Sequence, residues 1–192
     1  TVASLLDPRR SAPPAPRQAV PLAPSARTAL ADWEPIARPI AMFGLETPWL
    51  GDGPRQYSAR RSADESRRED RLQFGVLDGP APHLLMRVTV DRAGPRRPDP
   101  FLVTLARDAA AQGLGIGRAG TVSGLATGFG LVETADVVLA GEGHRRACIA
   151  FRLDGASQVL AFGGWWCGTD GKPADRTRLA CLIERLDLLS AG

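Results

Sequence analysis

Proline is concentrated at the start of this chain, where ten of the 16 prolines precede Gln56. Residues 11–27 hold five of them among Ala and Ser, with no apolar period. Such a segment cannot bury enough apolar surface to offset its ordering entropy, and proline biases it toward extended conformations. We therefore expect residues 1–30 to be a Pro/Ala-rich linker or disordered tail, with the globular core further along the chain.

The next segment, residues 31–71, has two parts. Residues 31–54 combine four prolines with aromatic and aliphatic side chains, too apolar for a free linker and too interrupted for a long helix or a central strand. We expect an extended strap that covers the main core. Residues 55–71 carry charges of both signs and no periodic apolar face, which predicts a solvated charged loop or a short exposed helix. A substrate-binding arginine cluster is the alternative for this second part.

Residues 72–192 show short apolar runs separated by turn signals. The predicted strands are 72–77, 83–90, 131–140, 148–153 and 158–166. The last two form a hairpin of central strands in which Phe151 is expected opposite Leu160. Asp99 and Gly113 delimit a predicted helix at about 99–112, and leucine spacing predicts another at about 174–189. These elements predict a single α+β domain, with a mainly antiparallel sheet packed by two helices.

The net charge of +3 belongs to the tail, because residues 1–30 carry four arginines and one aspartate. The rest of the chain is formally neutral, so the basic balance says nothing about a ligand of the domain. Basic residues are 23 arginines and one lysine, Lys172, which we attribute to the codon bias of a GC-rich genome. Nucleic-acid binders usually combine clustered arginines with stacking aromatics, whereas Tyr57 is the only tyrosine in the sequence. No nucleic-acid partner is expected.

The three cysteines are too few for a disulfide-built scaffold. Cys148 lies among small apolar neighbours, where a buried thiol is expected. Cys181 points away from the leucine stripe of its predicted helix, and thirteen residues connect it to Cys167. We therefore predict a Cys167–Cys181 disulfide, which implies an oxidising compartment, the periplasm or cell envelope. Two free cysteines in a cytoplasmic protein are the alternative.

The sequence holds no local motif for catalysis or for a cofactor. Gly115, Gly117 and Gly120 form a GxGxxG string, but a helix rather than a strand precedes it. A zinc site built from His144 and the cysteines lacks any CxxC pair. Neither GxSxG nor GxxxxGK[ST] is present. We expect no metal, no cofactor and no enzymatic activity, with a hydrolase assembled only by the tertiary fold as an alternative.

The pair Trp165 and Trp166 is the most unusual surface candidate. Adjacent side chains on a strand point to opposite faces, and we expect both tryptophans to be packed under the strap and the C-terminal helix. In the alternative, one is exposed as a ligand or partner contact, since Trp is enriched at binding surfaces. Arg145 and Arg146, near the opposite end of the preceding strand, are candidates for contacts with an anionic partner.

The function expected from these features is that of a noncatalytic accessory or protein-interaction domain of the bacterial cell envelope, tethered through its N-terminal linker to a protein partner there. A small-molecule or peptide binding module that uses the Trp165/Trp166 region is the alternative. The longest apolar runs fall far short of the roughly 18–20 residues that cross a bilayer. Contact with the membrane is therefore expected only through a segment upstream of Thr1.

Overall fold

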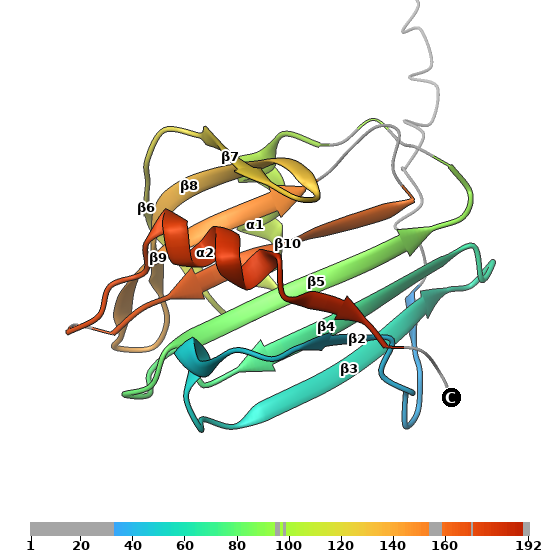
Figure 1. Ribbon diagram of the computed structural model, residues 1–192, viewed down its shortest axis with the longest axis horizontal. Coiled ribbons are helices and arrows are strands. Elements are labelled where there is room, and N and C mark those ends of the chain that lie inside the picture. The colour runs from blue at the N-terminus through green and yellow to red at the C-terminus, as the bar shows by residue number, and fades with distance from the viewer. Residues whose placement is uncertain (1–32, 95–96, 98, 154–158, 170, 190–192) are drawn as a thin grey trace, which may run out of the picture. The chain divides into compact units, whose positions relative to one another are not determined.

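The computed structural model describes residues 33–94, 97, 99–153, 159–169 and 171–189, so the expected linker at 1–30 lies outside the described residues. Nine strands form one antiparallel sheet (Figure 1). They are β1 (Trp33–Pro35), β3 (Arg55–Ser62), β4 (Arg67–Phe74), β5 (His83–Asp91), β6 (Gly115–Ala119), β7 (Ser123–Thr127), β8 (Gly130–Ala140), β9 (Arg145–Leu153) and β10 (Leu160–Cys167). Their order is β1-β3-β4-β5-β10-β9-β8-β6, with β7 also paired to β8. The predicted antiparallel sheet is confirmed.

The central strands β5, β10 and β9 are apolar at most positions and are buried on both faces, as predicted for the second hairpin. The register differs from the expected one, because Phe151 lies opposite Gly164 rather than Leu160. A side-chain carbon at Gly164 would lie 1.9 Å from the carbonyl oxygen of Leu85. Only glycine lets β5 and β10 approach so closely at this position.

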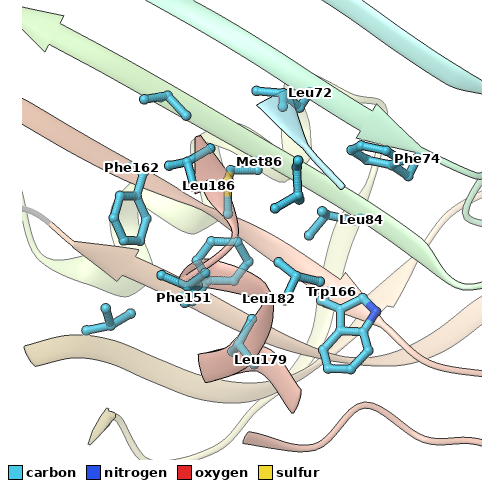
Figure 2. Close-up of a cluster of buried hydrophobic side chains, with 14 of the residues drawn as sticks. Leu72, Phe74, Leu84, Met86, Phe151, Phe162, Trp166, Leu179, Leu182 and Leu186 are labelled. Atoms are coloured by element: carbon cyan, nitrogen blue, oxygen red, sulfur yellow. The ribbon is translucent and has the colours of Figure 1, made fainter. Parts of the chain in front are cut away.

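One face of the sheet is covered by the C-terminal part of the chain and by the strap. Helix α2 (Arg176–Ile183) packs there with the small antiparallel sheet formed by β2 (Phe43–Leu45) and β11 (Leu186–Leu188), in front of the large sheet in Figure 1. Figure 2 shows how leucines from α2 and the β2–β11 side meet Phe151, Phe162 and Trp166 from the sheet. This cluster is the larger of two hydrophobic cores.

Helix α1 (Phe101–Ala110) covers the other face of the sheet, behind it in Figure 1. Phe101, Leu105 and Ala109 recur at helical spacing and bury one stripe against Trp165. The helix ends before Gly113, whose φ of +70° is the left-handed conformation in which glycine is favoured. The two helices therefore occupy opposite layers around one sheet.

The predicted helix boundaries need two corrections. Asp99 does not cap α1; its carboxylate pairs with Arg107, and the cap position is Pro100 without a side-chain cap. The second helix is shorter than 174–189: it follows Asp175, whose carboxylate accepts the Arg178 N–H at 2.9 Å, and gives way to strand β11. The leucine stripe is still buried at Leu186, but through a strand paired with β2.

The charged segment 55–71 is not a loop. It forms β3 and the first part of β4, joined by a short turn. The apolar alternation is interrupted on the buried side by Asp70, which lies opposite Ala59. Asp70 is completely buried and bonded through Oδ1 and Oδ2 to Arg68. A polar residue facing a core hides the period of two that identifies a strand.

Residues 43–50 pack on the α2 side, where the short helix η1 (Pro48–Leu50) contributes the buried Leu50, whereas β1 extends the edge of the large sheet beside β3. The strap is attached to the sheet by polar contacts as well. The Tyr57 hydroxyl accepts the Met42 N–H at 2.8 Å and donates to Asp70, and Arg68 donates to the Ile40 carbonyl at 2.8 Å. Burial and the hydrogen bond to Asp70 raise the pKa of Tyr57. These hydrogen bonds therefore attach the strap to β3 and β4.

No helix of the described residues is long and apolar enough to cross a membrane.

Candidate functional site

The disulfide joins Cys148 to Cys167, so the predicted Cys167–Cys181 pairing is wrong. The two cysteines lie directly opposite each other on β9 and β10, with their Cα atoms 4.0 Å apart. Both side chains face α1, whereas α2, which carries Cys181, packs on the opposite side of the sheet. Cys181 is an exposed free thiol. The expectation of one disulfide bridge is correct, but its partner was misassigned.

Both tryptophans of the pair are buried, on opposite faces, as the adjacency of their side chains required. Trp165 is 0% exposed and packs under α1, whereas Trp166 is 3% exposed and lies in the core beneath α2. Neither offers an exposed aromatic surface. Each indole Nε1 is buried and has no hydrogen-bond partner within the described residues.

Of the two candidate arginines, Arg146 serves the fold. Its guanidinium donates to the Gly168 carbonyl at 2.9 Å, to the Ala81 carbonyl at 2.7 Å and to carbonyls of residues 76–79. This side chain therefore holds the β4–β5 connection against the end of β10. Arg145 is exposed at the start of β9.

The two histidines differ in burial and in their contacts. His83 is buried, and its Nδ1 contacts the carbonyl oxygens of Phe74 at 3.1 Å and Gly75 at 3.3 Å, an arrangement that requires a proton on Nδ1. Burial lowers its pKa. The ring is therefore neutral near pH 7 with Nε2 as an acceptor. His144 is exposed in the turn before β9.

The most distinctive surface lies on the α1 side of the sheet, on the half that α1 leaves uncovered. Every residue that β3 and β4 place there is polar, and β5 adds an arginine. We call this surface the polar face; it consists of Gln56, Ser58, Arg60, Glu69, Arg71, Gln73 and Arg87. It adjoins Asp108 on α1 and Gln112 in the turn after that helix.

The two carboxylates beside this face are held by arginines. Glu69 accepts from Arg60 at 2.8 Å and lies 4.0 Å from Arg87, and Asp108 forms an ion pair with Arg87. Burial raises the pKa of Asp108, while the Arg87 guanidinium opposes that rise. Each of these acids is therefore balanced by a cation within the structure.

Arg71 is different. It lies directly opposite Arg87 on the neighbouring strand, and its guanidinium donates to the amide oxygen of Gln112, in the turn that follows α1. No carboxylate of the described residues lies within ion-pair distance of it. Burial and the charge of Arg87 lower the pKa of Arg71, and the charge of Glu69 opposes that change. The half-buried Arg71 therefore has an electrostatic interaction with Glu69 but no ion pair of its own among the described residues.

Three pockets follow the boundary between α1 and the polar face. The first, of about 190 Å³, lies between α1 and β5 and contains the Arg87–Asp108 pair. The second, of about 390 Å³, surrounds Arg71 and is otherwise lined by uncharged polar residues: Gln56, Tyr57, Ser58, Gln73 and Gln112. The third, of about 130 Å³, is lined by Gln73 and Gln112, the apolar residues Val76, Leu77, Leu85 and Leu114, and His83 and Trp165.

The sequence predicts a charged loop or short exposed helix at residues 55–71, which supply most of the polar face, whereas Gln73 and Arg87 fall in predicted strands. The alternative of a substrate-binding arginine cluster concerns these residues but does not predict that they form one face of a sheet. The available signal was the alternation Gln56, Ser58, Arg60 against Tyr57 and Ala59, which is a period of two with a polar outer face. The contact of Arg71 with Gln112, 41 residues later in the chain, has no local signal at all.

Among the residues that the structure describes, no three His, Cys, Asp or Glu side chains are grouped in a way that could hold a metal ion. No protein-family model, curated protein or solved structure matches the chain.

Proposed function

We propose that this chain is a noncatalytic accessory domain of the bacterial cell envelope that binds a protein partner through the polar face. The observation that carries the proposal is the polar face itself. It lies on the half of the sheet that α1 leaves uncovered, and it contains the pocket around Arg71. The Pro/Ala-rich residues 1–30 are proposed as the tether of the domain. We propose no nucleic-acid partner for the arginines or for Lys172.

A noncatalytic role is supported by the way the buried acids are used. Asp70 is bonded to Arg68 and Tyr57, and Glu69 to Arg60. A carboxylate paired with a guanidinium has its countercharge and its charge-assisted hydrogen bonds within the protein. In this proposal, these acids serve as countercharges within the sheet.

An envelope location is supported by the Cys148–Cys167 disulfide, because structural disulfides persist in oxidising compartments and are rare in the cytosol. The exposed Cys181 thiol offers a direct test. Cells that express the chain from its own gene are treated with a membrane-impermeant maleimide after the outer membrane alone has been permeabilised. We expect labelling of Cys181 in these intact cells and no labelling in a Cys181→Ser variant. Labelling that requires lysis of the inner membrane would contradict the location.

Partner binding is tested by site-specific photocrosslinking in the same cells. A photoreactive amino acid replaces Ser58, which is exposed on the polar face, or Asp187, which is exposed on β11 on the other side of the sheet. We expect a discrete protein adduct from position 58 and none of that mass from position 187. The proposal fails if position 58 gives no adduct, or if both positions give the same set of adducts.

A further inference from the structure

Arg71 forms no ion pair among the described residues, although the charge of Glu69 acts favourably on it. Like charges directly opposite each other on neighbouring strands repel, and Arg71 faces Arg87 in this way. Arg87 has Asp108 as its countercharge, whereas the recorded hydrogen-bond partner of the Arg71 guanidinium is the uncharged Gln112. An anion bound at Arg71 would remove the imbalance at this one position.

The pocket around Arg71 suits a carboxylate that belongs to a peptide. A guanidinium binds a carboxylate through parallel hydrogen bonds. Its neighbours Gln56, Ser58, Gln73 and Gln112 supply amide and hydroxyl groups, which can pair with the N–H and C=O groups of a peptide backbone. The nearest acid, Glu69, is already bonded to Arg60, so its repulsion of a ligand carboxylate is reduced.

A second pocket lies beside the first, since both are lined by Gln73 and Gln112. Its volume of about 130 Å³ suits a small side chain, and most of its wall is apolar. Two polar groups also belong to that wall: the neutral His83 and Trp165, whose buried indole N–H has no acceptor within the described part of the chain. An oxygen on the ligand would give this N–H the acceptor that it lacks.

We infer that Arg71 binds the α-carboxylate at the C-terminus of the partner, and that the adjoining pocket binds the side chain of the partner's last residue, a small one with a methyl group and an oxygen, as in threonine. A terminal residue carries its carboxylate and its side chain on the same Cα, so both can reach adjacent pockets. An internal aspartate uses its side chain as the carboxylate and has nothing left for the second pocket. This inference rests on the proposed function, of which it specifies the ligand.

The test uses the purified full chain and the peptide acetyl-Gly-Ala-Thr with a free carboxylate, titrated by ¹H–¹⁵N NMR and calorimetry. We expect shifts of the Trp165 indole N–H and the Arg71 Nε–H, assigned with the Trp165→Phe and Arg71→Gln variants. The same peptide with a C-terminal amide should bind at least about tenfold more weakly, because it lacks the charge-assisted bonds.

Two variants separate recognition at Arg71 from general attraction of an anion. Arg71→Gln should weaken binding of the free acid at least about tenfold and remove the difference between acid and amide. Arg118→Gln removes the same charge from an exposed position on the edge strand β6 and should leave both affinities unchanged. Equal affinities of acid and amide, or an equal loss in both variants, would overturn the inference.

A third peptide, acetyl-Gly-Asp-Ala with a C-terminal amide, decides between a terminal and an internal carboxylate. Binding as tight as that of the free-acid threonine peptide would overturn the assignment of a C-terminus. The readouts also separate this inference from the proposed function. A crosslinked partner at Ser58 together with no peptide binding leaves the accessory role in place and removes only the C-terminal ligand; peptide binding without a crosslinked protein removes the protein partner.

Discussion

Arg71 and Arg87 lie directly opposite each other on β4 and β5, yet only Arg87 has an ion pair, with Asp108. Like charges in this position destabilise a sheet. The Arg71→Gln variant should therefore be more stable than the wild type by about 0.5–1 kcal/mol in urea unfolding.

The salt dependence checks the cause of that gain. In about 1 M salt the repulsion between Arg71 and Arg87 is screened, and the advantage of Arg71→Gln should shrink. Arg118→Gln, at an exposed position of β6, serves as the charge-matched control and should change the unfolding free energy little in either condition. A variant Arg71→Gln that is less stable than the wild type would show that the bond to Gln112 outweighs the repulsion.

The disulfide makes a second prediction about stability. Cys148 and Cys167 are 19 residues apart, and closing such a loop stabilises by about 3 kcal/mol in the chain-entropy model. The double variant Cys148→Ala/Cys167→Ala should lose about that amount in chemical unfolding, whereas Cys181→Ala should lose little because its side chain is exposed. Alkylation of the unfolded, unreduced protein, followed by peptide mass spectrometry, should label Cys181 alone. A label on Cys148 would contradict the pairing.

The disulfide also shows what sequence could and could not supply. The apolar runs of β9 and β10 identified both strands, their pairing and their central place. The expected register, with Phe151 opposite Leu160, would have put Cys148 opposite Gly163; the observed register is shifted by four residues and brings Cys167 to that position. An even shift keeps every side chain on its predicted face, so burial was correct while the partners were wrong.

Strand β3 and the first part of β4 were missed for a different reason. Their outer face forms the polar face, and their inner face includes the buried Asp70, which only its contacts with Tyr57 and Arg68 make possible. Local hydrophobic patterns contain no record of such contacts. The pocket around Arg71 was missed with them, since Arg71 and Gln112 meet only in the tertiary structure.

Tyr57 links the strap to the sheet, which gives a third prediction. In Tyr57→Phe the Met42 N–H loses its acceptor and Asp70 loses one donor. The cost should be about 1–3 kcal/mol of unfolding free energy, because partly buried polar groups are left without partners. Ser58→Ala, one residue away and exposed, should stay within about 0.5 kcal/mol of the wild type. A loss in Tyr57→Phe as small as that of Ser58→Ala would show that the strap does not depend on this anchor.

His83 predicts a pH dependence of stability. Its pKa in the folded protein is below the unperturbed 6.5, so on acidification the unfolded chain takes up a proton before the buried ring does. The unfolding free energy should therefore fall as the pH drops below about 6.5, by at most about 1.4 kcal/mol per pH unit for one group. Urea unfolding between about pH 7.5 and 5.5 measures this loss.

Two variants assign that pH dependence. His83→Gln removes the titrating ring and should flatten the profile in this window, even if it lowers stability at every pH. His144→Gln, at an exposed turn position, should keep the profile of the wild type. If the loss below pH 6.5 persists unchanged in His83→Gln, another group is responsible for it.

Arg145 and Arg146 are adjacent on β9 and differ in what they touch, so they form a matched pair for the last prediction. The guanidinium of Arg146 donates to the carbonyl of Gly168 after β10 and to the carbonyl of Ala81 in the β4–β5 connection. A lysine keeps the charge but cannot direct donors to both sides from one planar group. Arg146→Lys should therefore lose about 1.5–3 kcal/mol, the range for a hydrogen bond to a charged group. Arg145→Lys, at an exposed position, should lose little. Equal losses in urea unfolding would contradict this role of Arg146. A selective loss in Arg146→Lys would show that this one side chain stabilises the 76–81 connection, which forms one wall of the proposed peptide pocket.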